Sequence, residues 1–139
     1  MINIKIKNRT TPDNITHLEE SQIFVFGSNE SGAHGAGAAK TAMDWGANWD
    51  QAEGLQGKTY AIPTVSLNRK RTLTVDEISP YVKNFIDFAR NNPNLTFLVT
   101  AIGCGLAGLK IDQIAPLFYD TMDVENVWLP RRFWKVLIG

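Results

Sequence analysis

Two stretches of this sequence have the same order of parts: a short apolar run, a glycine-rich turn, and a segment of helix-forming residues. The first runs from the apolar residues 23–26 through a loop over 27–37, and the second from residues 95–100 through a loop over 102–109. Runs that are apolar at every position are typical of central strands covered by helices on both faces. This repeated order therefore predicts an α/β fold with a largely parallel sheet.

One helix has a clear start signal. Thr74 and Glu77 match a capping box, in which each side chain satisfies a backbone N–H group of the other residue. Apolar residues follow at helical spacing, and residues 91–93 (NNP) stop the helix. These apolar positions are Ile78, Val82, Phe85, Ile86 and Ala89.

The other elements are predicted from shorter patterns. Isoleucine alternates with polar residues over 2–6, which indicates an edge strand, and a polar turn is expected over 10–14. The first glycine loop leads into a helix that begins near 35–37 and fades at Gly46. The remaining predictions are a strand over 58–63 closed by Pro63, a helix over 112–121 and a last strand over 124–130.

Alternating strands and helices predict a three-layer α/β/α fold with a central mixed, largely parallel sheet. Residues 1–139 contain no repeat or linker that would divide them, so a single domain is expected. One cysteine excludes an internal disulfide and a thiolate metal cluster, and neither a metal nor a cofactor is expected. No apolar run is long enough for a membrane span or a signal peptide, so we expect a cytoplasmic protein that does not bind membranes.

The glycine loops predict an anion site. In open α/β sheets, ligands bind beyond the carboxyl ends of the strands, where such turns gather. Backbone N–H groups at a helix start favour phosphates, and glycine lets the backbone approach them closely. Two such loops suit a diphosphate better than a single phosphate. The spacing of Gly32, Gly35 and Gly37 matches neither a Walker A nor a Rossmann fingerprint.

The two loops also resemble a known family. The segments FVFGSNESGAHGAGAAKTAMDWGA and VTAIGCGLAGLKIDQIAPLF are similar to the two ligand loops of macrodomains, which bind ADP-ribose. The motif IGCGL is similar to the corresponding loop sequence in the lineage that includes terminal ADP-ribose glycohydrolases. The motif GSN…HGAGAA resembles the first loop of small macrodomain-like proteins of phages and bacteria.

The resemblance implies a small-molecule, ADP-ribose-like ligand and assigns residues to it. Three residues would lie beside the distal ribose, and further residues from both loops would enclose the diphosphate. The first group is Gly27, Ser28 and Asn29; the second is Gly35, Ala36 and Gly37 from the first loop with Gly103, Cys104, Gly105, Leu106, Ala107 and Gly108 from the second.

Two departures separate the chain from the glycohydrolase lineage. That lineage has a catalytic aspartate after GCGL, where Ala107 stands here. Its lysine nucleophile would fall at Met43 or Asp44, and Lys40 is not its counterpart. A lysine-adduct mechanism is therefore not expected.

Asn29 and His34 are the candidate catalytic residues. Asn29 would orient a water molecule or bind a ribose hydroxyl, or else only support a turn. His34 would transfer protons, or else only hydrogen-bond to the loop backbone. Cys104 follows a strand and lacks a neighbouring base, so it is interpreted as a small buried residue.

The basic residues offer a different function. Residues 68–71 (NRKR) and the tail 130–139 could bind a polynucleotide. Lysine plus arginine equals aspartate plus glutamate at 14 each, which argues against nucleic acid as the partner. The tail also mixes apolar residues with its charges, so it would either dock on the sheet edge or drive self-association into a homo-oligomer.

Three hypotheses follow from the sequence. The first is a binding module for ADP-ribose or a related nucleotide, with weak hydrolysis of ADP-ribose esters or phosphates. The second is an active ADP-ribosyl hydrolase or phosphatase. The third is a nucleic-acid-binding accessory protein.

Overall fold

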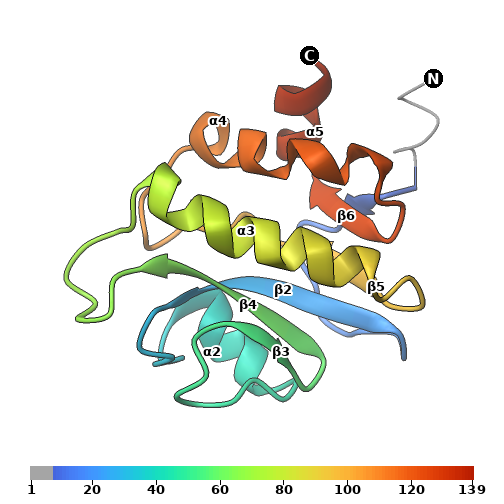
Figure 1. The fold of residues 1–139 in the computed structure, drawn as a ribbon. Helices are drawn as coiled ribbons and strands as arrows, with labels where there is room; N and C mark the ends of the chain where they lie inside the picture. Colours follow the sequence, from blue (N-terminus) through green and yellow to red (C-terminus); the bar gives the residue numbers. More distant parts are fainter. Residues whose placement is uncertain (1–7) are drawn as a thin grey trace.

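The fold is built on one six-stranded sheet (Figure 1). It is seen in a computed structural model that describes residues 8–139, so the strand predicted over 2–6 lies outside the described residues. The strands are β1 (Thr10–Thr11), β2 (Gln22–Asn29), β3 (Gly54–Gln56), β4 (Thr59–Val65), β5 (Thr96–Val99) and β6 (Val127–Pro130), in the spatial order β1-β6-β5-β2-β4-β3. Every pair is parallel except β3–β4, which confirms the prediction of a mixed, largely parallel sheet.

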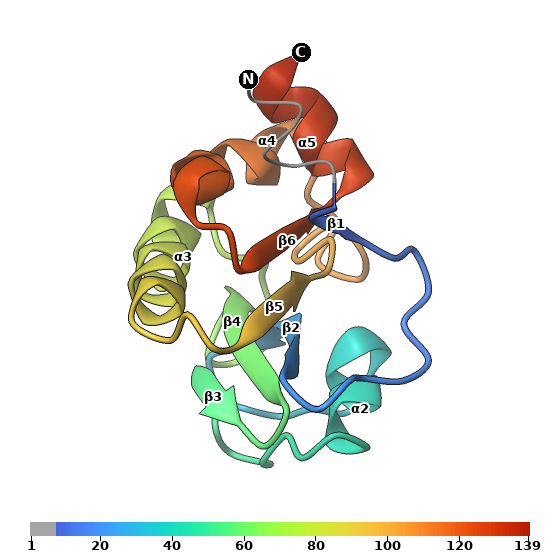
Figure 2. The ribbon, with the colours of Figure 1, turned by 90° about the vertical axis from the view of Figure 1, so that its right-hand side faces the viewer.

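Helices cover both faces of the sheet (Figure 2). On one face lie α3 (Val75–Arg90), the short α4 (Ile111–Ile114) and the 3-10 helix η1 (Ala115–Asp123). On the other face lies α2 (Gly37–Met43). The α/β class and the three-layer arrangement are therefore confirmed.

The core has two parts, one on each face of the sheet. Phe85, Phe97 and Phe118 pack together in the larger part, beneath α3 and η1, with ring centroids 5.4 and 6.3 Å apart. The smaller part lies beneath α2, where Phe24 and Phe26 contact Ala39 and Ala42 of the helix. Alanine at these α2 positions lets the helix lie close to the end of β2.

The capping box forms as predicted. Thr74 Oγ1 accepts from Glu77 N at 3.2 Å, and Glu77 Oε1 accepts from Thr74 N at 2.9 Å. Helix α3 then runs to Arg90 and buries the five apolar residues that the spacing had selected.

Pro63 does not close its strand, which is a correction. Strand β4 continues to Val65 and stays paired with β2, which itself continues past Gly27 to Asn29. Proline cannot donate to the ladder, and the register shifts by one residue between Ser28 and Asn29, just after Ser28 pairs with Pro63. The sequence missed β3, and it predicted a turn where Thr10 and Thr11 pair with β6.

The tail forms α5 (Arg131–Ile138) directly after β6. Phe133 and Trp134 are buried in the larger core, whereas Val136 and Ile138 are exposed. Trp134 Nε1 donates to Arg9 O at 2.8 Å, which ties the helix to the chain just before β1. Of the two predicted outcomes, the structure shows docking at the β1–β6 end of the sheet.

Across residues 8–139, no helix combines the length and the apolar character that a membrane crossing requires.

Candidate functional site

The two glycine loops line one cavity of about 440 Å³. The loops meet because β2 and β5 are parallel neighbours, so their carboxyl ends lie at the same edge of the sheet. Nine of the predicted ligand residues line the cavity: Gly27, Ser28, Asn29, Ala36, Gly37, Gly103, Gly105, Leu106 and Ala107.

Close backbone packing joins the loops at their base. A Cβ atom at Gly27 would lie 3.3 Å from Gly103 N, and Gly103 itself has a φ of +73°. Glycine at position 27 permits this close approach, and Gly103 adopts a backbone conformation that other residues rarely adopt.

The Asn29 side chain is occupied by the first loop. Its Oδ1 accepts from Ser31 Oγ at 2.6 Å and from Ala33 N at 3.0 Å, while its Nδ2 donates to Ala33 O at 2.9 Å. These contacts leave one amide N–H of Asn29 for a ligand. Ser28 is likewise engaged, since its hydroxyl donates to Ala52 O at 2.5 Å.

Hydrogen bonds across a tight turn shape the second loop. Leu109 N donates to Gly103 O at 2.7 Å, and Gly108 N donates to Gly105 O at 3.0 Å. The turn raises Leu106 into solvent, where it is 83% exposed.

Both loops have free main-chain donors at the cavity. The N–H groups of Gly105, Leu106 and Ala107 donate to no acceptor within residues 8–139, and neither does the N–H group of Ala36. The lining of this cavity contains no charged side chain. What it offers a ligand is therefore mainly backbone N–H groups, which suit phosphate oxygens.

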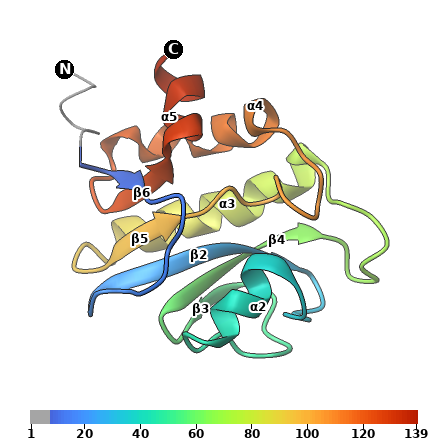
Figure 3. The ribbon, with the colours of Figure 1, turned by 180° about the vertical axis from the view of Figure 1, so that it is seen from behind.

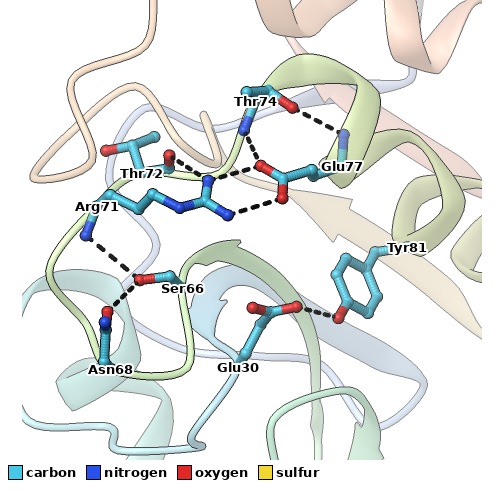
Figure 4. A network of polar contacts seen from close by, with 8 residues as sticks. All are labelled: Glu30, Ser66, Asn68, Arg71, Thr72, Thr74, Glu77 and Tyr81. Atoms are coloured by element: carbon cyan, nitrogen blue, oxygen red, sulfur yellow. Dashed lines mark hydrogen bonds and ion pairs between the residues drawn. The ribbon is translucent and has the colours of Figure 1, made fainter.

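The hairpin between β4 and α3 supports the second loop. Thr72 Oγ1 donates to Ala107 O at 2.5 Å. The hairpin is itself fixed by Arg71, whose guanidinium binds the two carboxylate oxygens of Glu77 at 2.7 and 2.8 Å (Figure 4). Arg71 and the Thr74 N–H together lower the pKa of Glu77 to about 2.

Arg69 and Lys70 at the hairpin tip are exposed and form no ion pair within the described part of the chain. Behind the hairpin, Tyr81 donates to Glu30 Oε2 at 2.6 Å, and this bond raises the pKa of Tyr81 to about 12 (Figure 4). Of the predicted basic loop, Arg71 therefore has a structural role, and only its neighbours are free to bind a polyanion.

A second cavity of about 240 Å³ adjoins the first. The two cavities share the lining residues Ala38, Thr100 and Ala101, so they lie next to each other, and we refer to the pair as the cleft. Residues of the chain segment between β1 and β2, of β2 itself and of α5 line the second cavity, including Asp13, Asn14, Ile15, Phe24 and Arg132. The sequence analysis missed this part of the site. The signal that could have indicated it is the run of polar residues over 10–14, which precedes the buried strand β2.

His34 lies outside both cavities. It is 2% exposed, and its ring packs edge-on against Phe26 at 5.3 Å between centroids. Nε2 lies 3.1 Å from both Gln51 O and Gln56 Oε1. Both partners are acceptors, so Nε2 carries the proton. Its Nδ1 atom has no partner within residues 8–139.

Three more predicted ligand residues do not line the cavity: Gly35, Cys104 and Gly108. Burial raises the pKa of the Cys104 thiol, while nearby Arg132 acts in the opposite direction. A neutral, half-buried thiol agrees with the interpretation of Cys104 as a packing residue.

Comparison with known proteins gives no relative for this chain: no family model, no curated protein and no solved structure matches it. No group of three or more metal-ligating side chains occurs within residues 8–139. The geometry of the cleft therefore carries the functional argument.

Proposed function

We propose that the cleft binds ADP-ribose or a closely related nucleoside diphosphate derivative. The observation that carries the proposal is the joint lining of one cavity by both glycine loops, with free backbone N–H groups in each. Backbone donors without competing side chains suit the closely spaced oxygens of a diphosphate. The resemblance of both loop sequences to those of macrodomains supports the same ligand.

The adjoining cavity suits the nucleoside. Phe24 and Ile15 supply apolar surface for a base, while Asp13 and Asn14 supply polar groups that discriminate among bases. Ligand sites commonly combine an apolar lining with a few polar groups in this way. The diphosphate would then lie between the glycine loops, and the second ribose would extend towards Asn29.

Binding is better supported than hydrolysis. The two candidate catalytic residues are not brought together, because Asn29 lines the cavity whereas His34 is buried outside it. Proton transfer by His34 would need direct contact, or contact through one water molecule, with the reacting group. Hydrolysis of ADP-ribose esters or phosphates stays a prediction, to be tested by turnover in wild type and in Asn29→Ala.

Calorimetric titration with ADP-ribose tests the binding proposal, with AMP and ribose 5-phosphate as partial ligands. We expect ADP-ribose to bind more tightly than either fragment, because it occupies both cavities. Absence of binding by the folded protein at millimolar ADP-ribose would overturn the proposal.

A matched pair of variants locates the site. Ala36→Glu places a carboxylate at the lining of the larger cavity, where it would repel a diphosphate. Met43→Glu places the same charge on an exposed residue of α2 that lines neither cavity. We expect the first variant to lose binding and the second to retain it. Equal affinities in the two variants would place the ligand elsewhere.

A further inference from the structure

The nucleoside end of the cleft has one cationic side chain, that of Arg132. Within residues 8–139, no other lysine or arginine lines either cavity. Arg132 is exposed and forms no ion pair with any carboxylate of those residues, although Asp13 lines the same cavity. Its guanidinium is therefore free to bind an anion.

The position of Arg132 in α5 is unfavourable for the helix alone. Arg131 and Arg132 both lie in the first turn, and that turn contains no acidic residue. Cations at a helix N-terminus are opposed by the helix dipole. Pro130, the N-cap residue, also gives no side-chain capping bond, so the first N–H groups of α5 lack the usual partner. An anion bound here would relieve both defects.

A second polar side chain at this cavity, that of Thr11, also lacks a partner. Thr11 lines the cavity and is 3% exposed, yet its hydroxyl forms no hydrogen bond within residues 8–139. It pairs with Pro130 in the β1–β6 register, which places it at the start of α5. Buried hydroxyls normally have partners. The Thr11 hydroxyl and Arg132 are thus two unpaired polar groups at one end of the cleft. Figure 3 shows the ribbon from the side on which α5, α2 and the chain segment before β2 lie in front of the sheet.

The anion in question is not the diphosphate. The larger cavity, which both glycine loops line, does not include Arg132 among its lining residues. Arg132 lines only the cavity assigned to the nucleoside. If the diphosphate lies between the glycine loops, an anion bound by Arg132 belongs to the nucleoside, and its ribose is the part that can carry a phosphate. In dinucleotide-binding folds, an arginine in the equivalent chemical position accommodates the ribose 2′-phosphate.

We propose that Arg132 binds a phosphate on the nucleoside ribose, so that the preferred ligand is the 2′-phosphorylated form of ADP-ribose. The inference rests on the proposed function, because it assumes that the diphosphate lies between the glycine loops. Arginine matches phosphate with two parallel N–H donors, and the bonds are charge-assisted. The 2′-phosphorylated ligand is preferred because its added phosphate binds Arg132, an interaction that unmodified ADP-ribose does not make.

The test compares ADP-ribose and ADP-ribose 2′-phosphate on wild type, Arg132→Ala and Arg131→Ala by calorimetry. In wild type, we expect the 2′-phosphate to bind roughly tenfold more tightly, as one charge-assisted interaction would give. Arg132→Ala is expected to abolish this difference between the two ligands. Arg131→Ala removes a neighbouring charge that lines neither cavity, and it is expected to keep the difference.

The outcomes separate the two proposals. Equal binding of both ligands to wild type would overturn the inference and leave the proposed function intact. An equal loss for both ligands in Arg132→Ala would also overturn it, because Arg132 would then serve the diphosphate. If neither ligand binds wild type, both proposals fail. Unchanged melting temperatures of the two variants would show that the comparison is between folded proteins.

Discussion

Leu106 of the second glycine loop lies against Gly37 of the first. A Cβ atom at Gly37 would come within 3.3 Å of Leu106 Cδ1, and both residues line the larger cavity. The contact joins loops that are about 70 residues apart in the chain. Because both residues line the cavity, changes at either residue should alter it.

Gly37→Ala tests this contact. Gly37 has a φ of +59°, so alanine would be strained and would also press on Leu106. We expect the free energy of unfolding to fall by about 1 kcal/mol and the affinity for ADP-ribose to fall with it. Gly105→Ala is the control, because a Cβ there would meet nothing within 4 Å. Urea unfolding should show a change of less than about 0.5 kcal/mol for the control; equal losses would contradict the argument.

Thr72→Val tests the support of the second loop. The change keeps the shape of the side chain but removes the hydrogen bond to Ala107 O. We expect a loss of about 1 kcal/mol in unfolding free energy and faster hydrogen exchange of the Gly108 and Leu109 amides, which are the hydrogen-bonded ones in this loop. Thr72→Ser retains the hydroxyl and should behave as wild type. Identical exchange in the valine variant would show that the bond does not hold the loop.

Glu77→Gln tests the pH dependence of the capping box. The pKa of Glu77 is lowered to about 2 in the folded protein, from an ordinary value of 4.5. The ionised carboxylate therefore stabilises the fold above about pH 4.5, and this contribution disappears as the pH falls towards 2. Glutamine can still complete the capping box, but it cannot pair with the Arg71 guanidinium.

Unfolding free energies should accordingly fall less between pH 5 and pH 2 in Glu77→Gln than in wild type. Asp76→Asn is the control. Asp76 also lies in the first turn of α3, but it forms no ion pair within residues 8–139. An equal slope for wild type and Glu77→Gln would show that the ion pair does not contribute.

Arg9→Lys tests a buried cation that the sequence did not single out. The Arg9 guanidinium donates to four main-chain oxygens, those of Thr121, Met122, Val124 and Val127, at 2.7 to 3.1 Å. Burial lowers its pKa. A compact ammonium cannot reach all four acceptors, so we expect a loss of about 3 kcal/mol in unfolding free energy. Arg131→Lys, at an exposed position, should change it by less than about 0.5 kcal/mol.

Local patterns in the sequence predicted most of the scaffold. The apolar runs became β2 and β5, and Thr74 with Glu77 started α3 where the capping box placed it. These signals are local, because helix capping and strand burial depend on residues within a few positions of one another. The predictions were wrong where strand pairing outweighs the local preference of a residue. Pro63 stays within a paired strand although proline was expected to end it, and Thr10 pairs with β6 although a turn was expected there.

The site was partly predictable for the same reason. Glycines after buried strands indicated the larger cavity, and nine of the proposed residues line it. The sequence could not show that His34 points away from that cavity and into the network of Gln51 and Gln56. The direction of a side chain in an irregular loop depends on distant partners.

The sequence by itself therefore determined two units of strand, glycine loop and helix, and it predicted that the backbone of each loop would suit an anion. Tertiary structure decided that the loops share one cavity, because the parallel pairing of β2 and β5 brings their carboxyl ends together. It also brought Asp13 and Arg132, far apart in the chain, to the cavity beside the loops. Local sequence fixes the geometry of each turn, whereas a binding site depends on which turns the sheet places side by side.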